Sequence, residues 1–290
     1  MAKIHIQFTL FSAFYSPLIS TMTSNFLSEE GLEFDWSVAK PGISALEALE
    51  DGTAQVVQST ISQGFTSLEK GIKPKPKHFA LINNMDGFFI TGREADASFN
   101  WSSLEGADVL VHHGGQPMTM FKYACKNANI DISKINIIDA GNAKEMDTAF
   151  RNGTGQYIHQ QGPAPQQLET EGVGYVLAAL GPVVGGCAFS SLAAMPDWLD
   201  SSEGQAFSQA YAKTRQYIAS TPAAEIAAAE KPLFQDIDEA VLAKCIDAYQ
   251  QMGCWPASTA ITNEGYEAML DIFEFDGKLT KRHAFEDICM

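Results

Sequence analysis

The sequence predicts an α/β protein made of two similar lobes. Strand and helix patterns alternate from the N-terminus in the order β-α-β-α-β, which is typical of a parallel sheet. The pattern of residues 48–58 returns at 149–159, at an offset of 101 and with four identities in eleven positions. Two apolar stretches join the halves. We therefore expect two sheets whose loops, at the carboxyl ends of the strands, line a common cleft.

The first lobe begins directly at the N-terminus. Pro17 suits the first turn of a helix, which Gly31 would end, and Ser59 and Thr60 would cap a later helix. We expect strands at 4–8, 33–38 and 54–58, and helices at 17–27 and 45–49.

The second lobe is centred on residues 107–123. Val109, Leu110 and Val111 form a short apolar run suited to a buried strand, and a helical pattern begins near Met118. Between them, glycines and a proline predict a sharp turn into a helix start. The free amides of such a helix end bind anions or the polar edge of a ring.

The connections predict where the lobes meet. Apolar runs at 79–82 and 87–91 would lead into the second lobe, and 183–192 would form the matching return strand. We expect lobe one to comprise residues 1–88 and 190–290, and lobe two residues 89–189. In the tail we expect helices at 207–218, from Pro222, at 241–249 and at 266–275, with the last packed on the first lobe.

Composition narrows the classes of partner. The chain has 290 residues and a net charge of −16, so it offers no basic field for nucleic acid or an anionic membrane. The five cysteines show no metal-binding spacing and are expected to be reduced. No segment is expected to insert into a membrane, and no secretory leader precedes the first strand. The protein is either cytoplasmic as it stands or a periplasmic mature form whose leader a methionine replaced.

The order of elements and several short segments resemble a known family. Residues 104–109, 149–153, 277–282 and 285–287 are similar to segments of the solute-binding proteins of nitrate, sulfonate, taurine and thiamine-pyrimidine ABC transporters. The resemblance implies the type 2 periplasmic binding fold, with a hinge of two crossing strands. It further implies closure around a small molecule for ABC-type uptake, with an ABC permease as the partner.

The same superfamily holds enzymes, which supply the alternative reading. A cytoplasmic protein similar to hydroxymethylpyrimidine synthase, in thiamine biosynthesis, would share this fold. That enzyme is expected to carry a cysteine-rich iron motif, whereas residues 185–189 contain only Cys187. A desulfinase would place a nucleophilic cysteine where this chain has Tyr15 and Ser16. Both departures argue against those chemistries.

The loops expected to line the cleft favour an uncharged ligand. They contain Lys40 but no arginine, the usual bidentate partner of a sulfonate or carboxylate. Aromatic side chains would sandwich a ring such as a pyrimidine, and amides would read its edges. A sulfonate or taurine-like ligand would have to rely on helix N-termini. The expected ligand contacts are Phe11, Phe14, Tyr15, Gly42, Ser44, Gln58, Ser59, Asn84, Asp86, His113, Gly114, Gly115, Gln116, Asp139, His159, Gln160 and Gln161.

Histidines are the candidates for any chemistry at this site. His112 and His113 are adjacent on a strand, so only one enters the cleft, and we expect it to be His113. His113, His159 and Asp139 could converge as a metal or acid–base site. The favoured interpretation is ligand hydrogen bonding without a metal, a cofactor or a covalent change. In the enzyme reading, His113 and His159 would be the catalytic residues.

Overall fold

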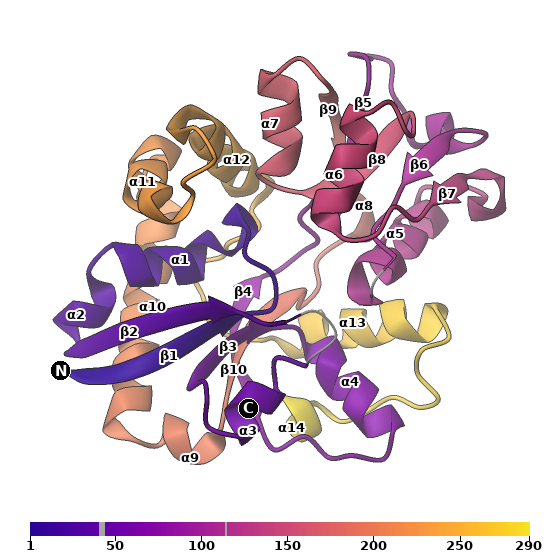
Figure 1. The fold of residues 1–290 in the computed structure, drawn as a ribbon. Coiled ribbons are helices and arrows are strands. Elements are labelled where there is room, and N and C mark those ends of the chain that lie inside the picture. The colour runs from indigo at the N-terminus through magenta and orange to yellow at the C-terminus, as the bar shows by residue number, and fades with distance from the viewer. Residues whose placement is uncertain (41–43, 114) are drawn as a thin grey trace.

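Two five-stranded sheets form the two lobes of the protein (Figure 1). The computed structural model describes residues 1–40, 44–113 and 115–290. The strand orders are β2-β1-β3-β10-β4 and β7-β6-β8-β5-β9, so the predicted two-lobed α/β fold is confirmed. The first sheet contains β1 (Ala2–Phe8), β2 (Leu32–Val38), β3 (Val56–Ser59), β4 (Lys77–Asn83) and β10 (Ser190–Ala194). The second contains β5 (Phe88–Gly92), β6 (Asp108–Leu110), β7 (Asn136–Ile138), β8 (Tyr157–Gln161) and β9 (Tyr175–Ala179).

The two sheets have the same topology. In each, a central strand pairs in parallel with two others: β1 with β2 and β3, and β6 with β7 and β8. The next strand, β10 or β5, runs antiparallel and follows a crossing from the other lobe. Val56 and Tyr157 begin β3 and β8 and are 101 positions apart, so the internal repeat places equivalent residues at equivalent strand ends.

The second crossing differs from the prediction. Residues 183–192 do not form one strand, because α8 (Gly181–Val184) occupies the first part and the strand is β10. Pro182 lies at the start of this helix, where its missing N–H is harmless, and Gly185, with φ of +94°, ends it. The chain leaves the second sheet through β9, which the sequence pattern did not reveal, and enters the first sheet at β10.

Helices flank both sheets. The helix expected at 17–27 is divided at Asn25, whose φ is +62°. In the first half of the chain the helices are α1 (Ser16–Thr23), α2 (Phe26–Glu29), α3 (Glu47–Glu50), α4 (Ile61–Glu69) and α5 (Gly115–Asn127). They continue with α6 (Ala143–Arg151), α7 (Ala164–Thr170), α9 (Pro196–Leu199), α10 (Ser202–Ser220) and α11 (Ala223–Glu230). The last are α12 (Glu239–Met252), α13 (Asn263–Phe275) and α14 (Phe285–Ile288).

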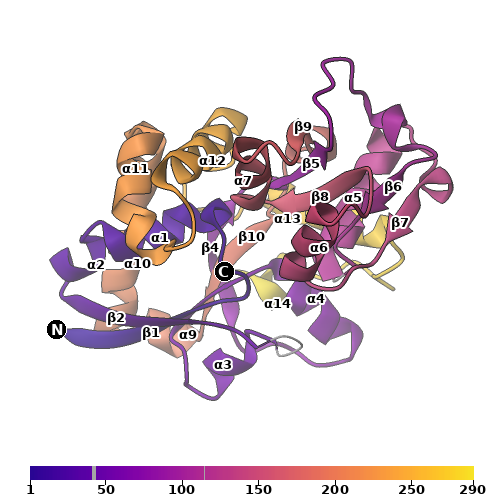
Figure 2. The ribbon, with the colours of Figure 1, turned by 45° about the horizontal axis from the view of Figure 1, so that its top comes forward.

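The C-terminal helices contact both lobes. In two views α11 and α12 lie between α1 and α7 (Figure 1, Figure 2). The rings of Tyr266 and Phe273 on α13 pack edge-on against Phe65 of α4, as expected for packing on the first lobe. Phe275 of the same helix also packs against Tyr123 of α5, in the second lobe. The tail therefore spans the boundary between the lobes.

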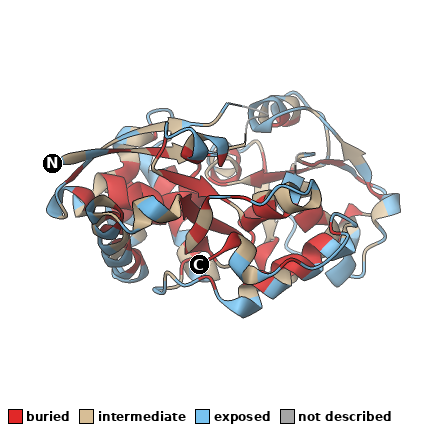
Figure 3. Ribbon diagram, turned by 90° about the horizontal axis from the view of Figure 1, so that it is seen from below, coloured by how far each residue is buried: buried red, intermediate tan, exposed pale blue. Residues whose placement is uncertain are grey.

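Burial follows the sheets of both lobes (Figure 3). One continuous cluster of buried side chains includes Ile6 of β1, Ile90 of β5 and Val109 of β6, so the core extends across the boundary between the lobes. All five cysteine thiols are free and buried. Within the described residues, none of the helices has the length and apolar character needed to cross a membrane.

Candidate functional site

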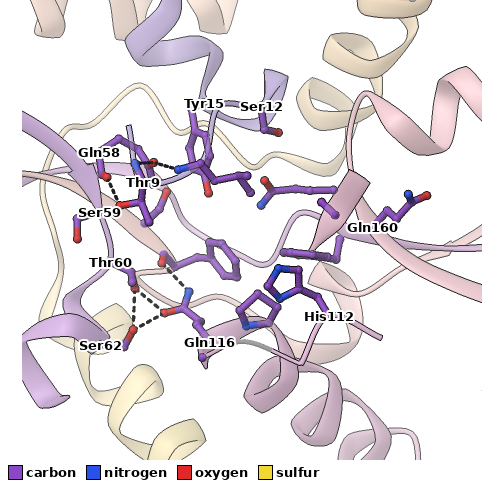
Figure 4. A pocket seen from close by; sticks show the side chains of 18 of the residues that line it. Thr9, Ser12, Tyr15, Gln58, Ser59, Thr60, Ser62, His112, Gln116 and Gln160 are labelled. Atoms are coloured by element: carbon purple, nitrogen blue, oxygen red, sulfur yellow. Dashed lines mark hydrogen bonds between the residues drawn. The ribbon is translucent and has the colours of Figure 1, made fainter. Parts of the chain in front are cut away.

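A cavity of about 660 Å³ lies where the two sheets face one another (Figure 4). Its walls come from the ends of β3 and β8, the loop after β1, and the first turns of α4 and α5. Gln58 and Ser59 in the first lobe occupy the positions that His159 and Gln160 occupy in the second. The parallel strands direct these side chains to one cleft, as expected at the carboxyl ends of such strands.

The cavity brings together part of the expected contact set and leaves part outside. The expected residues in its wall are Phe11, Tyr15, Gln58, Ser59, Gly115, Gln116, His159, Gln160 and Gln161. The expected residues that do not line it are Phe14, Ser44, Asn84, Asp86, His113 and Asp139. Gly42 and Gly114 fall outside the described residues.

Phe14 belongs to the core beneath the cavity. Its ring is fully buried and packs against Phe189 and Tyr249 at centroid distances of 5.5 and 4.8 Å. It also lies directly above Gly87, where a Cβ atom would collide with it. Phe14 therefore fills the space beside the crossing between the lobes instead of facing a ligand.

Asn84 and Asp86 lie in that same crossing. The backbone of Asn84 accepts a hydrogen bond from Cys187 and donates one to Cys254. Asp86 accepts a 2.7 Å bond from the N–H of Phe88 through Oδ1, and its Oδ2 has no partner among the described residues. Burial raises the pKa of Asp86 to about 7. These side chains belong to the hinge region.

His113 turns away from the cavity, and His112 lines it instead. His113 Nδ1 lies 2.8 Å from the carbonyl of Val111 and 3.8 Å from Asp139. The β6 strand ends at Leu110, so strict alternation does not extend to the two histidines. The expected convergence of His113 with His159 is therefore wrong. Ser44, also outside the wall, donates to Gln63 at 2.9 Å.

Several lining residues were not among the named ligand contacts. Thr9, Ser12 and Thr60 lie in loops that were expected to line the cleft, and Thr60 is the repeat equivalent of Gln161. Phe189 and Lys278 reach the cavity from the distant C-terminal half, and short-range patterns contain no signal for them. Lining residues that were not expected also include Ser62, Gln63, Phe88, Ser190 and Phe273.

Gln116 joins the lobes across the cavity. Its Oε1 accepts hydrogen bonds from the hydroxyls of Thr60 and Ser62, at 2.5 and 2.9 Å. Its Nε2 donates to the carbonyl of Phe189 at 2.8 Å. The amide is thus occupied by contacts within the protein. Ser12 makes a second cross-lobe bond, a 2.5 Å contact from its hydroxyl to the carbonyl of Gly162.

Aromatic rings form much of the remaining wall. Phe11 is already stacked with Trp36 and Phe234, at centroid distances of 4.7 and 4.8 Å. Burial raises the pKa of Tyr15, while hydrogen bonding to Gln161 and Gln58 opposes the shift. A ligand therefore meets aromatic edges, a neutral phenol and amides from both lobes.

Several polar atoms of the wall have no partner among the described residues. Both ring nitrogens of His159 are buried and unpaired, as are Ser59 Oγ, Gln160 Oε1 and Gln161 Oε1. Burial lowers the pKa of His159 to about 3, and the nearby His112 adds to this effect. Buried polar groups without partners are rare in folded proteins, so these atoms mark where a ligand or water would bind.

The wall carries few charged groups. Among the described lining residues, Lys278 is the only lysine, arginine or acid. Its Nζ lies 3.1 Å from Asp276, a carboxylate that it shares with Lys122, and donates to Thr119 at 2.6 Å. Lys40, expected near the cleft, does not line the cavity. Across the described residues, no three His, Cys, Asp or Glu side chains are placed to hold a metal ion.

Comparisons with known proteins agree with this arrangement. No model of a protein family matches the chain. The chain is 25% identical over 292 residues to YtlA of Bacillus subtilis (strain 168), a protein named provisionally as a binding protein. The match covers 99% of this chain and 87% of YtlA.

Solved structures share the fold. The zinc-bound ligand-binding component of an ABC-type import system from Staphylococcus aureus has a TM-score of 0.78 and 18% identity, covering 100% of this chain and 97% of its own. The periplasmic aliphatic sulphonate-binding protein SsuA from Escherichia coli has a TM-score of 0.74 and 15% identity, with coverages of 100% and 97%.

Two lobes of identical topology enclose an interlobe cavity, and the chain shares the fold of these periplasmic and ABC-type ligand-binding proteins. Over almost its whole length its sequence is similar to that of YtlA.

Proposed function

We propose that this protein binds a small, flat, neutral or weakly basic heterocycle, such as a pyrimidine, between its lobes and releases it unchanged to an ABC permease. The observation that carries the proposal is a cavity wall of aromatic, amide and hydroxyl groups in which the lone lysine is already paired. A polar ring matches such a wall, because its faces are apolar and its edges form hydrogen bonds.

The size of the cavity supports a ligand of this kind. Pockets for small molecules commonly span roughly 300–1,000 Å³, and the cavity of about 660 Å³ falls within that range. A single-ring heterocycle would fill part of it, and ordered water would occupy the remainder. A protein that delivers its ligand to an ABC permease in this way would act in the periplasm, after removal of a leader.

A sulfonate or taurine-like ligand is the second candidate. The first turns of α4 and α5 contribute Thr60 and Gln116 to the wall, and helix N-termini attract anions. SsuA of Escherichia coli is described as an aliphatic sulphonate-binding protein. The heterocycle is favoured because the described wall contains no arginine and its lysine is already bonded to Asp276 and Thr119.

A thermal-shift screen tests the proposal. The panel comprises pyrimidines, taurine, alkanesulfonates, nitrate and bicarbonate, since a ligand that binds only the folded state raises the melting temperature by mass action. We expect a shift with one or more pyrimidines and none with nitrate or bicarbonate. Mass spectrometry after incubation for hours should recover the bound ligand unchanged. A selective response to sulfonates would support the second candidate, and a chemically altered ligand would support an enzyme.

A further inference from the structure

His159 has unused hydrogen-bonding groups within the wall of the cavity. Its side chain is fully buried in the wall, and neither ring nitrogen has a partner among the described residues. The amide of Gln116, by contrast, is occupied on both of its polar atoms. Leaving a buried polar ring without partners costs free energy, and a ligand that supplies the missing partner would recover it.

The ring is held in a fixed orientation. It stacks on Phe88 at a centroid distance of 4.4 Å and an interplanar angle of 23°, and it leans on Phe121 at 5.3 Å. His159 also lies within β8, opposite Ile90 of β5. Because packing and backbone pairing fix this side chain, a ligand meets a preorganised group.

The internal repeat shows that this position differs between the lobes. The equivalent residue in the first lobe is Gln58, whose Oε1 accepts hydrogen bonds from the N–H groups of Thr9 and Leu10 at 3.0 and 3.3 Å. Gln58 therefore supports the loop after β1. His159 supports no other segment of the described chain through its ring nitrogens. The side chain at this strand end is bonded to a loop in the first lobe and has no described partner in the second.

The imidazole is neutral, and this limits what it can recognise. Burial lowers the pKa of His159 to about 3, and no carboxylate lines the described wall to reverse the shift. A neutral imidazole offers one N–H donor and one acceptor nitrogen. Pyrimidines such as uracil and cytosine carry both kinds of group along one edge. An oxyanion only accepts, so it would leave the acceptor nitrogen unmatched.

We propose that His159 is the specificity-determining residue of the cavity and that the polar edge of the ligand lies against β8, in the second lobe. This inference rests on the proposed function, because it names the edge of the heterocycle that the same cavity recognises. Ser59 Oγ and Gln161 Oε1, also without partners among the described residues, belong to the same cavity wall.

Isothermal titration with uracil, cytosine and orotate, an anionic carboxylate of the uracil ring, tests the inference. Wild-type protein should bind uracil or cytosine more tightly than orotate. His159→Phe keeps the ring that stacks on Phe88 but removes its nitrogens, and we expect it to weaken binding of the preferred pyrimidine about 10- to 100-fold. His159→Gln restores a donor and an acceptor, and its affinity should lie within about 10-fold of wild type.

His113→Phe is the matched control, since His113 lies outside the wall, and it should change affinity less than about 3-fold. Wild-type affinity in His159→Phe, or tighter binding of orotate than of uracil, would overturn the inference while leaving a binding function in place. Failure of both uracil and cytosine to bind wild type would contradict the proposed pyrimidine specificity itself. The two failures are therefore distinguishable.

Discussion

Buried carboxyl groups give single residues a strong effect on stability. Asp86 lies in the crossing between β4 and β5, with no exposed surface and one oxygen without a described partner. Burial raises its pKa to about 7, and Glu230, buried beneath Ser16 and Ser20 of α1, has a pKa raised to about 8. Both groups bind a proton more tightly in the folded state than in the unfolded chain.

This protonation predicts a pH dependence for Asp86. An unfolded aspartate has a pKa near 3.9, so stabilisation by the bound proton is complete below about pH 4 and is lost as the pH rises to about 7. Within that window the loss approaches about 1.4 kcal/mol per pH unit. Asp86→Asn, which stays neutral and can still accept from Phe88, should become progressively more stable than wild type between about pH 4 and 7, and the difference should level off above pH 7. Urea unfolding at several pH values measures this difference, and a difference that does not grow between pH 4 and 7 would contradict the prediction.

The residue scale also shows what sequence patterns could not provide. In the aromatic loop after β1, all three rings were expected to contact the ligand, whereas Phe14 packs under the cavity and Phe11 and Tyr15 line it. The distinction depends on Tyr249 and Phe189, which contact Phe14 from far along the chain. Local spacing indicates that a loop is aromatic, but the distant partners decide which ring is covered.

At the scale of elements, α5 and α13 are joined by one buried carboxylate. Asp276 directly follows α13, and its side chain is 4% exposed. It accepts hydrogen bonds from Lys122 and Thr119 of α5, each at 2.7 Å, and lies 3.1 Å from Lys278. Loss of the Asp276 carboxylate would leave two lysines and a hydroxyl without their acceptor, at the point where the C-terminal helices meet the second lobe.

Asp276→Ala is therefore expected to lower the free energy of unfolding by about 2–3 kcal/mol, because bonds to charged groups contribute more than neutral ones. Asp271→Ala provides the control: Asp271 lies on the same helix and pairs with Arg282, but its side chain is 58% exposed. An exposed pair contributes less than about 1 kcal/mol. Urea denaturation compares the variants, and equal losses would refute the importance of the α5–α13 link.

The repeat explains why most elements could be predicted. Strand and helix patterns recur at one offset, so β3 and β8 support each other's assignment. The exception is the second crossing, where α8 and β10 replace the expected long strand and β9, which precedes them, was not expected. All five residues of β9 are half-buried, and its composition of Tyr, Val, Leu and Ala alternates weakly, so periodicity gave no clear signal there.

At the scale of the whole molecule, the described structure is a closed arrangement of the lobes. Gln116 accepts hydrogen bonds from Thr60 and Ser62 of the opposite lobe, and Ser12 donates to Gly162 across the cavity. These cross-lobe contacts could not be read from the sequence, because they join residues 54 to 150 positions apart. Two crossings form the natural hinge about which such lobes open.

Removing the cross-lobe hydrogen bonds should shift the protein toward an open state. Each hydrogen bond contributes roughly 0.5–1.5 kcal/mol, so Ser12→Ala combined with Gln116→Ala should disfavour closure by about 2–4 kcal/mol. Small-angle X-ray scattering of the ligand-free chain measures the radius of gyration, which should be about 19 Å for 290 compact residues.

We expect the double variant to have a larger radius of gyration than wild type. A pyrimidine at saturating concentration should reduce this radius, since a ligand that prefers the closed state restores the population of that state. Ser44→Ala, outside the cavity wall, serves as the control and should leave the radius unchanged. Identical radii for wild type and double variant, with and without ligand, would mean that these bonds do not control closure.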